Sequence, residues 1–224
     1  MLTIHAADLV LPGGGHAPVP GGAVVVRDAE IAAVGPYEEV SAAFTQGLGS
    51  ARTGGTPMAA RVRRWPGVLT PALLQPFGPE LLEETYHPDS READELGTEP
   101  ITGAALDRLG PDESRWGPSA RRGLQRMLAH GTVAVAGTYT RPAVQEAVRR
   151  SGLITAGRAS APAGVPALDP YATGGPVVHT HVLLPGNHAR FAVFGVADEA
   201  ELLARGASTC VATVLGGRLL YRSR

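Results

Sequence analysis

The chain of 224 residues has no lysine, and all 20 of its basic residues are arginine. A lysine Schiff base, a lysine general base and a carboxylated lysine that bridges metal ions are therefore excluded. The formal net charge of −1 provides no excess of positive charge for nucleic acid or an anionic membrane surface. We expect neither a nucleic-acid partner nor a membrane partner.

Cysteine and long apolar runs are also scarce. Cys210 is the one cysteine, so no disulfide can form within the chain, which is typical of a reducing compartment. The first residues lack the basic and apolar segments of a signal peptide. No apolar run approaches the length of about 18 residues that indicates a membrane span. These absences predict a cytoplasmic protein.

Both ends of the chain have the pattern of β-structure. Short apolar runs at 2–10, 23–27 and 31–34 are separated by turn residues and predict a meander. Near the other end, 190–194 predicts a strand and 209–221 predicts a hairpin. We therefore expect β-structure at both termini.

The middle of the chain alternates between helix and strand. A helix that Ser119 could cap precedes a strand at 132–136, and a helix starting near Pro142 precedes a strand at 153–156. This alternation predicts parallel strands with right-handed crossovers. Residues 159–177 are rich in Pro, Ala and Gly without a period, and we interpret them as the connection back to the terminal β-structure.

Four segments carry a distinctive pattern of glycine, proline and apolar residues: 22–35, 65–73, 184–194 and 211–222. In this order they resemble the opening hairpin, the entry into the first barrel strand, the return strand and the closing hairpin of metal-dependent amidohydrolases of the imidazolonepropionase and deaminase type.

The resemblance implies an α/β protein in two parts. Residues 1–66 plus 182–224 would form a composite β-sandwich from both termini, and residues 67–181 would be a (β/α) barrel inserted between them. The insert has 115 positions, whereas a complete eight-stranded barrel of this kind needs about 200 or more. We therefore expect a truncated barrel remnant.

The resemblance also implies a divalent metal bound by a His-x-His pair at the end of the first barrel strand. The corresponding positions are Phe77 and Pro79, and neither side chain can bind a metal. No Gly-x-Ser-x-Gly elbow offers another chemistry, so no catalytic residue is assigned. These departures predict no cofactor, loss of the metal-dependent C–N hydrolase site, and a binding, regulatory or assembly role. The alternative is a hydrolase of non-peptide C–N bonds with an altered metal site.

That alternative has one candidate ligand set. His179 and His181, two residues apart, could bind zinc or another divalent metal with His188 as a third ligand. In the other interpretation, alternation places both imidazoles on a solvated face of a strand that enters the sandwich. We favour the second interpretation because the pair lies on the sandwich side of the junction.

An acidic stretch follows the first expected barrel strand. Eight carboxylates fall between Glu80 and Glu99, which is typical of a solvated loop and helix surface. If residues 77–111 instead cover the functional face of the barrel, Tyr86, His87 and the nearby carboxylates would bind a small polar ligand.

A remnant of about three parallel strands would have two free edges and an uncovered inner face. Val133, Val135, Leu153 and Ile154 are apolar and need cover on both faces of the sheet. The Pro and Gly content of 159–177 argues against a regular covering element. The sequence therefore predicts a two-fold homodimer.

Overall fold

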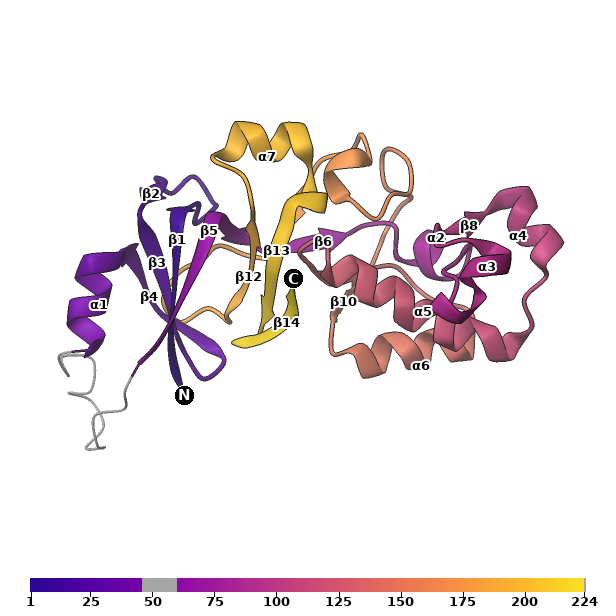
Figure 1. The fold of residues 1–224 in the computed structure, drawn as a ribbon, viewed down its shortest axis with the longest axis horizontal. Coiled ribbons are helices and arrows are strands. Elements are labelled where there is room, and N and C mark those ends of the chain that lie inside the picture. The colour runs from indigo at the N-terminus through magenta and orange to yellow at the C-terminus, as the bar shows by residue number, and fades with distance from the viewer. Residues whose placement is uncertain (46–59, 224) are drawn as a thin grey trace.

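The computed structural model describes residues 1–45 and 60–223, which form an elongated molecule with two main sheets arranged along its length (Figure 1). The strands are β1 (Leu2–Val10), β2 (Val19–Pro20), β3 (Gly22–Arg27), β4 (Glu30–Pro36), β5 (Arg61–Pro71), β6 (Leu73–Gln75), β7 (Thr85–Tyr86), β8 (Ile101–Thr102), β9 (Thr132–Ala136), β10 (Ile154–Ala156), β11 (Val178–His179), β12 (Arg190–Phe194), β13 (Cys210–Leu215) and β14 (Arg218–Arg222). The α-helices are α1 (Tyr37–Thr45), α2 (Gly78–Leu82), α3 (Ala93–Leu96), α4 (Gly103–Leu109), α5 (Glu113–Leu128), α6 (Pro142–Ser151) and α7 (Glu199–Arg205).

Strands from both ends of the chain join in one eight-stranded sheet, in the order β14-β13-β12-β5-β1-β3-β4 with β2 paired to β1. β5 connects the two ends, because it pairs in parallel with β1 and antiparallel with β12. The expected sandwich does not form two separate sheets within residues 1–45 and 60–223. The physical reason is the length of β5, whose 11 residues carry neighbours from both termini.

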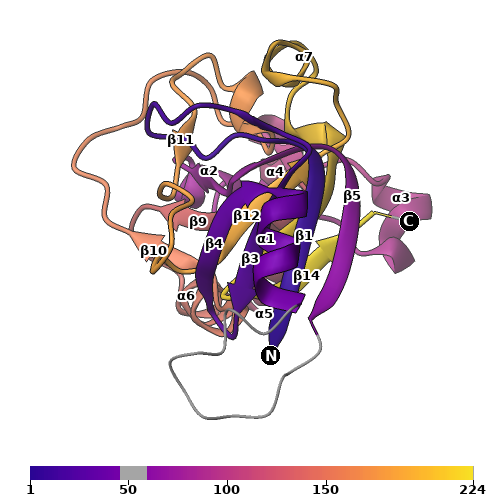
Figure 2. The same cartoon turned by 90° about the vertical axis from the view of Figure 1, so that its left-hand side faces the viewer.

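Alternation along β3 sorts its side chains onto the two faces of this large sheet. Val24 and Val26 share a core with Trp65, and we call the face that carries this core the inner face. Ala23 and Val25 belong to a second core on the outer face. Figure 2 shows α1 lying across that outer face.

The second sheet has the order β10-β9-β6-β11. β9 pairs in parallel with both β6 and β10, as the alternation of helix and strand predicts, whereas β11 is antiparallel to β6. β7 and β8 form a separate two-stranded sheet. The described residues thus form a mixed α/β structure without a closed barrel. We call the part built on β6, β9 and β10 the small lobe.

The two long helices of the small lobe begin and end at residues with clear physical roles. α5 begins after Asp112, whose carboxylate accepts a hydrogen bond from a backbone N–H in the first turn. Ser119 was expected as this cap; it lies inside the helix, and its buried hydroxyl accepts from the backbone N–H of His87. The prediction for α6 is confirmed: it begins at Pro142 and is followed by Gly152, with φ +73°.

The chain itself covers the sheet of the small lobe. Val133 and Val135 are fully buried, and Leu153 is also buried. Part of the cover comes from the irregular segment 159–177, since the Gln75 amide donates to carbonyl oxygens within it. These three residues therefore need no second copy of the chain to cover them, and the homodimer stays a prediction. None of the helices in the described ranges is both long and apolar enough to cross a membrane.

Candidate functional site

The parallel strands β6, β9 and β10 end at one edge of their sheet, where a barrel of this type would carry its functional residues. After β6, Gln75 is fully buried: its Nε2 donates to the Ala167 carbonyl at 2.9 Å, and its Oε1 accepts from the backbone N–H of Phe77 at 3.2 Å. Phe77 packs into the core of the small lobe, and Pro79 lies in the first turn of α2. The end of this strand therefore provides no imidazole or carboxylate to a metal.

The end of β10, which β9 separates from β6, carries a permanent cation. Arg158 follows β10, and its Nη1 donates to both carboxylate oxygens of Glu80, at 2.8 and 2.9 Å, and to the Pro76 carbonyl at 3.2 Å. The Arg158 and Glu80 side chains are 24% and 19% exposed, so water screens this pair only in part. A guanidinium group bound to the nearest carboxylate does not fit a divalent-metal site. In residues 1–45 and 60–223, no group of three or more His, Cys, Asp or Glu side chains is arranged to hold a metal ion.

The histidines near the end of the small lobe do not converge on a metal site. His179 pairs with Leu73 in the β6–β11 ladder, so it belongs to the small lobe and not, as expected, to a strand of the sandwich. The His181 ring already has two neighbours, with Nδ1 3.0 Å from the Thr180 hydroxyl and Nε2 2.7 Å from the His188 carbonyl oxygen. The side chains of His179 and His188 are exposed.

Tyr86 contacts protein groups through its hydroxyl. Its side chain is buried, and the hydroxyl lies 2.9 Å from a Glu92 carboxylate oxygen and 3.2 Å from Nε of Arg115. Arg115 also forms an ion pair with Glu92, at 2.6 Å. Burial, followed by the hydrogen bond to Glu92, raises the pKa of the Tyr86 phenol. This triad fastens the segment around β7 to α5.

His87 is fully buried beside Tyr86. Its Nε2 lies 2.8 Å from the Leu81 carbonyl oxygen, and its own carbonyl accepts from Nε of Arg122. Burial lowers the pKa of His87 to about 4, so the ring is neutral at pH 7 and Nε2 is the donor. Neither Tyr86 nor His87 lines the cleft described next, although Glu84 and Thr85 of the same segment do.

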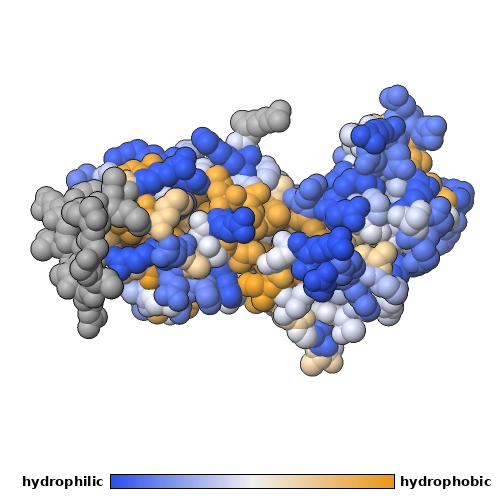
Figure 3. All heavy atoms as spheres, turned by 90° about the horizontal axis from the view of Figure 1, so that it is seen from below, coloured by the Kyte–Doolittle hydropathy of each residue, from blue (hydrophilic) through white to orange (hydrophobic). Residues whose placement is uncertain are grey.

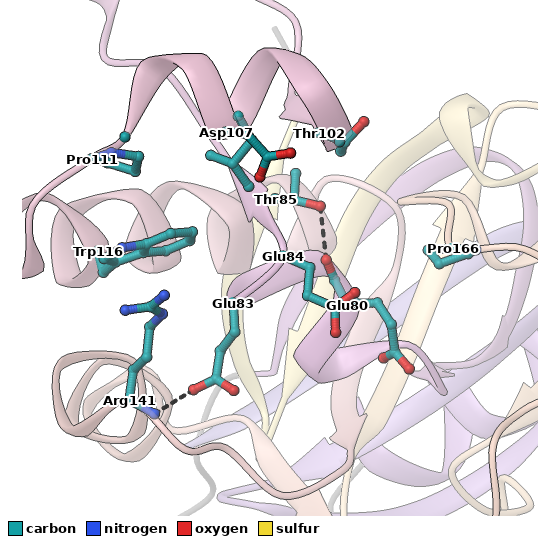
Figure 4. Close-up of a pocket in the computed structure, with 13 residues that line it drawn as sticks. Glu80, Glu83, Glu84, Thr85, Thr102, Asp107, Pro111, Trp116, Arg141 and Pro166 are labelled. Atoms are coloured by element: carbon teal, nitrogen blue, oxygen red, sulfur yellow. Dashed lines mark hydrogen bonds between the residues drawn. The ribbon is translucent and has the colours of Figure 1, made fainter.

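A cleft of about 710 Å³ opens at the edge where the parallel strands end (Figure 4). It is lined by Glu80, Glu83, Glu84, Thr85, Thr102, Gly103, Leu106, Asp107, Gly110, Pro111, Trp116, Arg141 and Pro166. Trp116 forms one wall, with the Arg141 guanidinium 4.3 Å from the centroid of its ring system. The carboxylates drawn in Figure 4 come from α2 (Glu80), from the two residues that follow it (Glu83 and Glu84) and from α4 (Asp107).

The carboxylates of the cleft differ in how they are compensated. Glu83 accepts hydrogen bonds from the backbone N–H groups of Thr140 and Arg141, at 2.8 and 2.6 Å. Glu84 and Asp107 are exposed, and within the described residues their side chains have no ion pair or hydrogen bond. The cleft therefore carries uncompensated negative charge at Glu84 and Asp107, an arrangement suited to a small cation.

One polar atom beside α2 lacks a partner. The Tyr139 hydroxyl is buried without a hydrogen bond, and a methyl group added at Gly78 would lie 2.4 Å from its oxygen. Burial, followed by the charges of Glu83 and Glu80, raises the pKa of this phenol. The backbone carbonyl oxygen of Ala136 would lie 2.5 Å from the same methyl group, so the close approach of both groups requires glycine at position 78.

Sequence reasoning found the acidic stretch but missed the opposite wall of the cleft. The stretch from Glu80 to Glu99 was noticed as a charge run, and three of its members line the cleft. Trp116 and Arg141 had no local signal, because a buried helix residue and an arginine beside a helix start have common structural roles. Arg158 was also missed, since its partner Glu80 is 78 positions away.

Comparisons with known proteins agree with the resemblance seen in the sequence. Residues 22–46, which contain β3, β4 and α1, match the family model described as the imidazolonepropionase-like composite domain, bacteria. A search of curated proteins found no match.

Among solved structures, the chain is similar to ochratoxinase from A. niger, with 20% identity and a TM-score of 0.41 over 70% of this chain and 31% of that one. It is similar to E. coli guanine deaminase, with 11% identity and a TM-score of 0.46 over 70% and 36% of the two chains. It is also similar to an adenosine deaminase from Xanthomonas campestris with bound Zn, with 15% identity and a TM-score of 0.43 over 68% of this chain and 32% of that one. The chain thus spans about a third of the length of these structures. The predicted resemblance to amidohydrolases with an imidazolonepropionase-like composite domain is confirmed, and the family model locates it in the hairpin and helix at residues 22–46.

Proposed function

We propose that this chain binds a small cationic ligand in the acidic cleft and has lost the metal-dependent C–N hydrolase chemistry of its relatives. The observation that carries the proposal is the pair of uncompensated carboxylates, Glu84 and Asp107, in a cleft whose other wall is Trp116. A protonated amine, amidine or imidazole would gain charge compensation there through charge-assisted hydrogen bonds to the two carboxylates.

The residues at the strand ends support the loss of hydrolysis. A metal-activated water needs a cluster of imidazole and carboxylate ligands with one open position. At these strand ends, Gln75 bonds to backbone groups and Glu80 is bound to Arg158. The groups present close the edge of the sheet through hydrogen bonds and fit no metal.

A ligand screen tests the binding role. Thermal shift is measured with guanidinium, imidazole, primary amines, amino acids and nucleosides, followed by calorimetry for any compound that stabilises the protein. We expect saturable binding of a cation, weakened at least tenfold in the Glu84→Gln, Asp107→Asn double variant. Glu95→Gln is the matched control, since Glu95 is also exposed in the acidic stretch but outside the cleft. Failure of every cation to bind, or equal affinity in the double variant, contradicts the proposal.

Elemental analysis of protein purified without a His tag tests the loss of the metal site. We expect less than stoichiometric zinc, iron or manganese after dialysis. One tightly bound metal per chain would instead support the altered C–N hydrolase, and removal of His179 or His181 would then show whether these residues hold it.

The homodimer remains part of the proposed assembly role. Figure 3 shows hydrophobic surface gathered in the middle of the molecule, between the large sheet and the small lobe. A second copy placed there would bury this surface through a symmetric contact. Sedimentation at low micromolar concentration should give a dimer, and a stable species at the 23.1 kDa monomer mass would contradict it.

A further inference from the structure

Three arginines gather on the large sheet, and none of them lines the acidic cleft. Arg61 and Arg63 alternate with Val62 along β5 and therefore lie on the same side as Trp65, the inner face. Arg222, near the end of β14, lies over Trp65 with its Cζ 5.7 Å from the centroid of the ring system. In the order of the sheet, β12 and β13 separate β5 from β14. The curvature of the sheet brings the two strands together, and Figure 2 shows β14 behind β1 and β5.

None of these guanidinium groups has a carboxylate partner within the described residues. The stretch 46–59, which precedes Arg61 in the sequence, contains no Asp or Glu either. Burial, followed by the charges of Arg61 and Arg222, lowers the pKa of Arg63. The three positive charges therefore repel one another without compensation.

The residues beneath these arginines, His5 and Trp65, do not compensate their positive charge either. His5 pairs with Arg63 in the β1–β5 ladder, and its Nδ1 accepts a hydrogen bond from Trp65 Nε1 at 3.1 Å. Burial, followed by the charges of Arg63 and Arg61, lowers the pKa of His5 to about 3, so its ring is neutral at pH 7. Trp65 is 7% exposed. His5 and Trp65 are thus neutral, and Trp65 offers little ring surface for stacking.

Seven other arginines within the described residues have a carboxylate partner, whereas some, such as Arg91 and Arg190, have none. An ion pair to Asp or Glu is formed by Arg115, Arg122, Arg141, Arg149, Arg150, Arg158 and Arg205. Unpaired like charges held together cost stability, and such costs are common at binding sites. Guanidinium groups provide planar forks of N–H donors that match the oxygens of phosphate, and several of them compensate an anion of more than one charge.

We propose that Arg61, Arg63 and Arg222 form a binding site for a phosphate-type oxyanion of a small molecule. A small molecule fits because the cluster is confined to three residues in a chain of net charge −1, whereas nucleic acid needs an extended basic stripe. Because Trp65 is nearly covered, the site recognises the oxyanion itself and not an attached ring. The site is separate from the acidic cleft, so either proposal can fail without the other.

Titration with inorganic phosphate and pyrophosphate tests this site, with ionic strength held constant by chloride. Binding is followed by calorimetry and by Trp65 fluorescence in a Trp116→Phe background, where Trp65 is the remaining tryptophan. We expect saturable binding of one pyrophosphate per chain, weakened at least tenfold in the Arg61→Gln, Arg222→Gln double variant. The control Arg205→Gln, in which an exposed and paired arginine is removed, should bind as the wild type does.

A second measurement separates a binding role from a structural one. Without added anion, the Arg61→Gln, Arg222→Gln variant should melt at the same temperature as the wild type or higher, because mutual repulsion is removed. A lower melting temperature together with unchanged pyrophosphate affinity would show that these arginines serve the fold. Absence of saturable binding to the wild type at millimolar pyrophosphate would also overturn the proposal.

Discussion

The large sheet and the small lobe are held together by different means. In the large sheet, long ladders such as those of β1 with β3 and β5 carry regular side-chain alternation and continuous apolar cores. In the small lobe, strands of three to five residues are joined by irregular connections, and polar contacts such as Arg158–Glu80 fix those connections. Backbone ladders thus organise the first region, and particular side-chain pairs organise the second.

The consequence for function is a division of roles. A region fixed by backbone pairing tolerates changes of surface side chains, so the unpaired arginines can remain on the large sheet. In the small lobe, which is fixed by side-chain pairs, charged residues both hold the connections in place and line the cleft. The two tryptophans provide a probe for each region, since Trp65 lies in the large sheet and Trp116 in α5. Trp65→Phe and Trp116→Phe variants would each isolate one probe.

The largest expected effect is from Phe191→Ala in the core of the large sheet. Phe191 is fully buried and packs edge-on against His5, with 4.8 Å between ring centroids. The cavity should lower the free energy of unfolding by about 3–5 kcal/mol. In urea, the Trp65 transition should move further than the Trp116 transition. If both move equally, the two regions unfold as one unit and the division is wrong.

The next effect is a dependence of the small lobe on pH through His87. Its folded-state pKa of about 4 lies below the ordinary value of 6.5, so the unfolded chain takes up a proton first as the pH falls. The stabilising contribution is full above pH 6.5 and declines down to about pH 4, by on the order of 3 kcal/mol. His87→Gln should remove this slope from the Trp116 transition. The exposed His188 provides the control, because His188→Gln should leave the slope in place.

A smaller effect is expected from the ion pair at the edge of the small lobe. Arg158→Met leaves the partly buried Glu80 carboxylate without its donor, at a cost of about 1–3 kcal/mol. Glu80→Gln should lose less when combined with Arg158→Met than when made alone, and a double-mutant cycle measures that coupling. Strict additivity of the two changes would mean that the pair does not hold the connection.

The smallest expected effects are from helix caps, one in each region. Asp112→Ala removes the cap of α5, and Asp198→Ala removes the cap of α7, where the carboxylate accepts from the backbone N–H of Glu201. Each change should cost about 1 kcal/mol. Trp116 should report the first loss more strongly, and Trp65 the second. If the loss of the α7 cap instead changed the Trp116 transition more than the Trp65 transition, α7 would belong with the small lobe and not with the large sheet.

The same contrast explains how much of the structure could be predicted from the sequence. Runs such as 23–27 and 132–136 have local patterns, and both are strands in the structure. The start of α6 at Pro142 was equally local. Such features depend on residues that are close in sequence, so they can be predicted without knowledge of the fold.

The rest depended on contacts between distant residues. Asp112 and Ser119 are both acceptable caps by type, and the choice between them follows from the burial of Ser119 against His87. The cleft could not be placed because it is lined from α2, α4 and the starts of α5 and α6, which only the fold brings together. The arginine site likewise requires the curvature that brings Arg222 over Trp65.

The position of Ala72 has a consequence for the size of the insert. This fully buried residue lies between β5 and β6; its N–H donates to the Arg190 carbonyl, and its carbonyl accepts from the Thr180 N–H. The entry and exit of the insert are therefore held side by side by the β5–β12 ladder. Closing a flexible loop of twice the length costs only about 0.6 kcal/mol more. The large sheet thus fixes the positions of the two ends of the insert and leaves the length of the chain between them almost unconstrained.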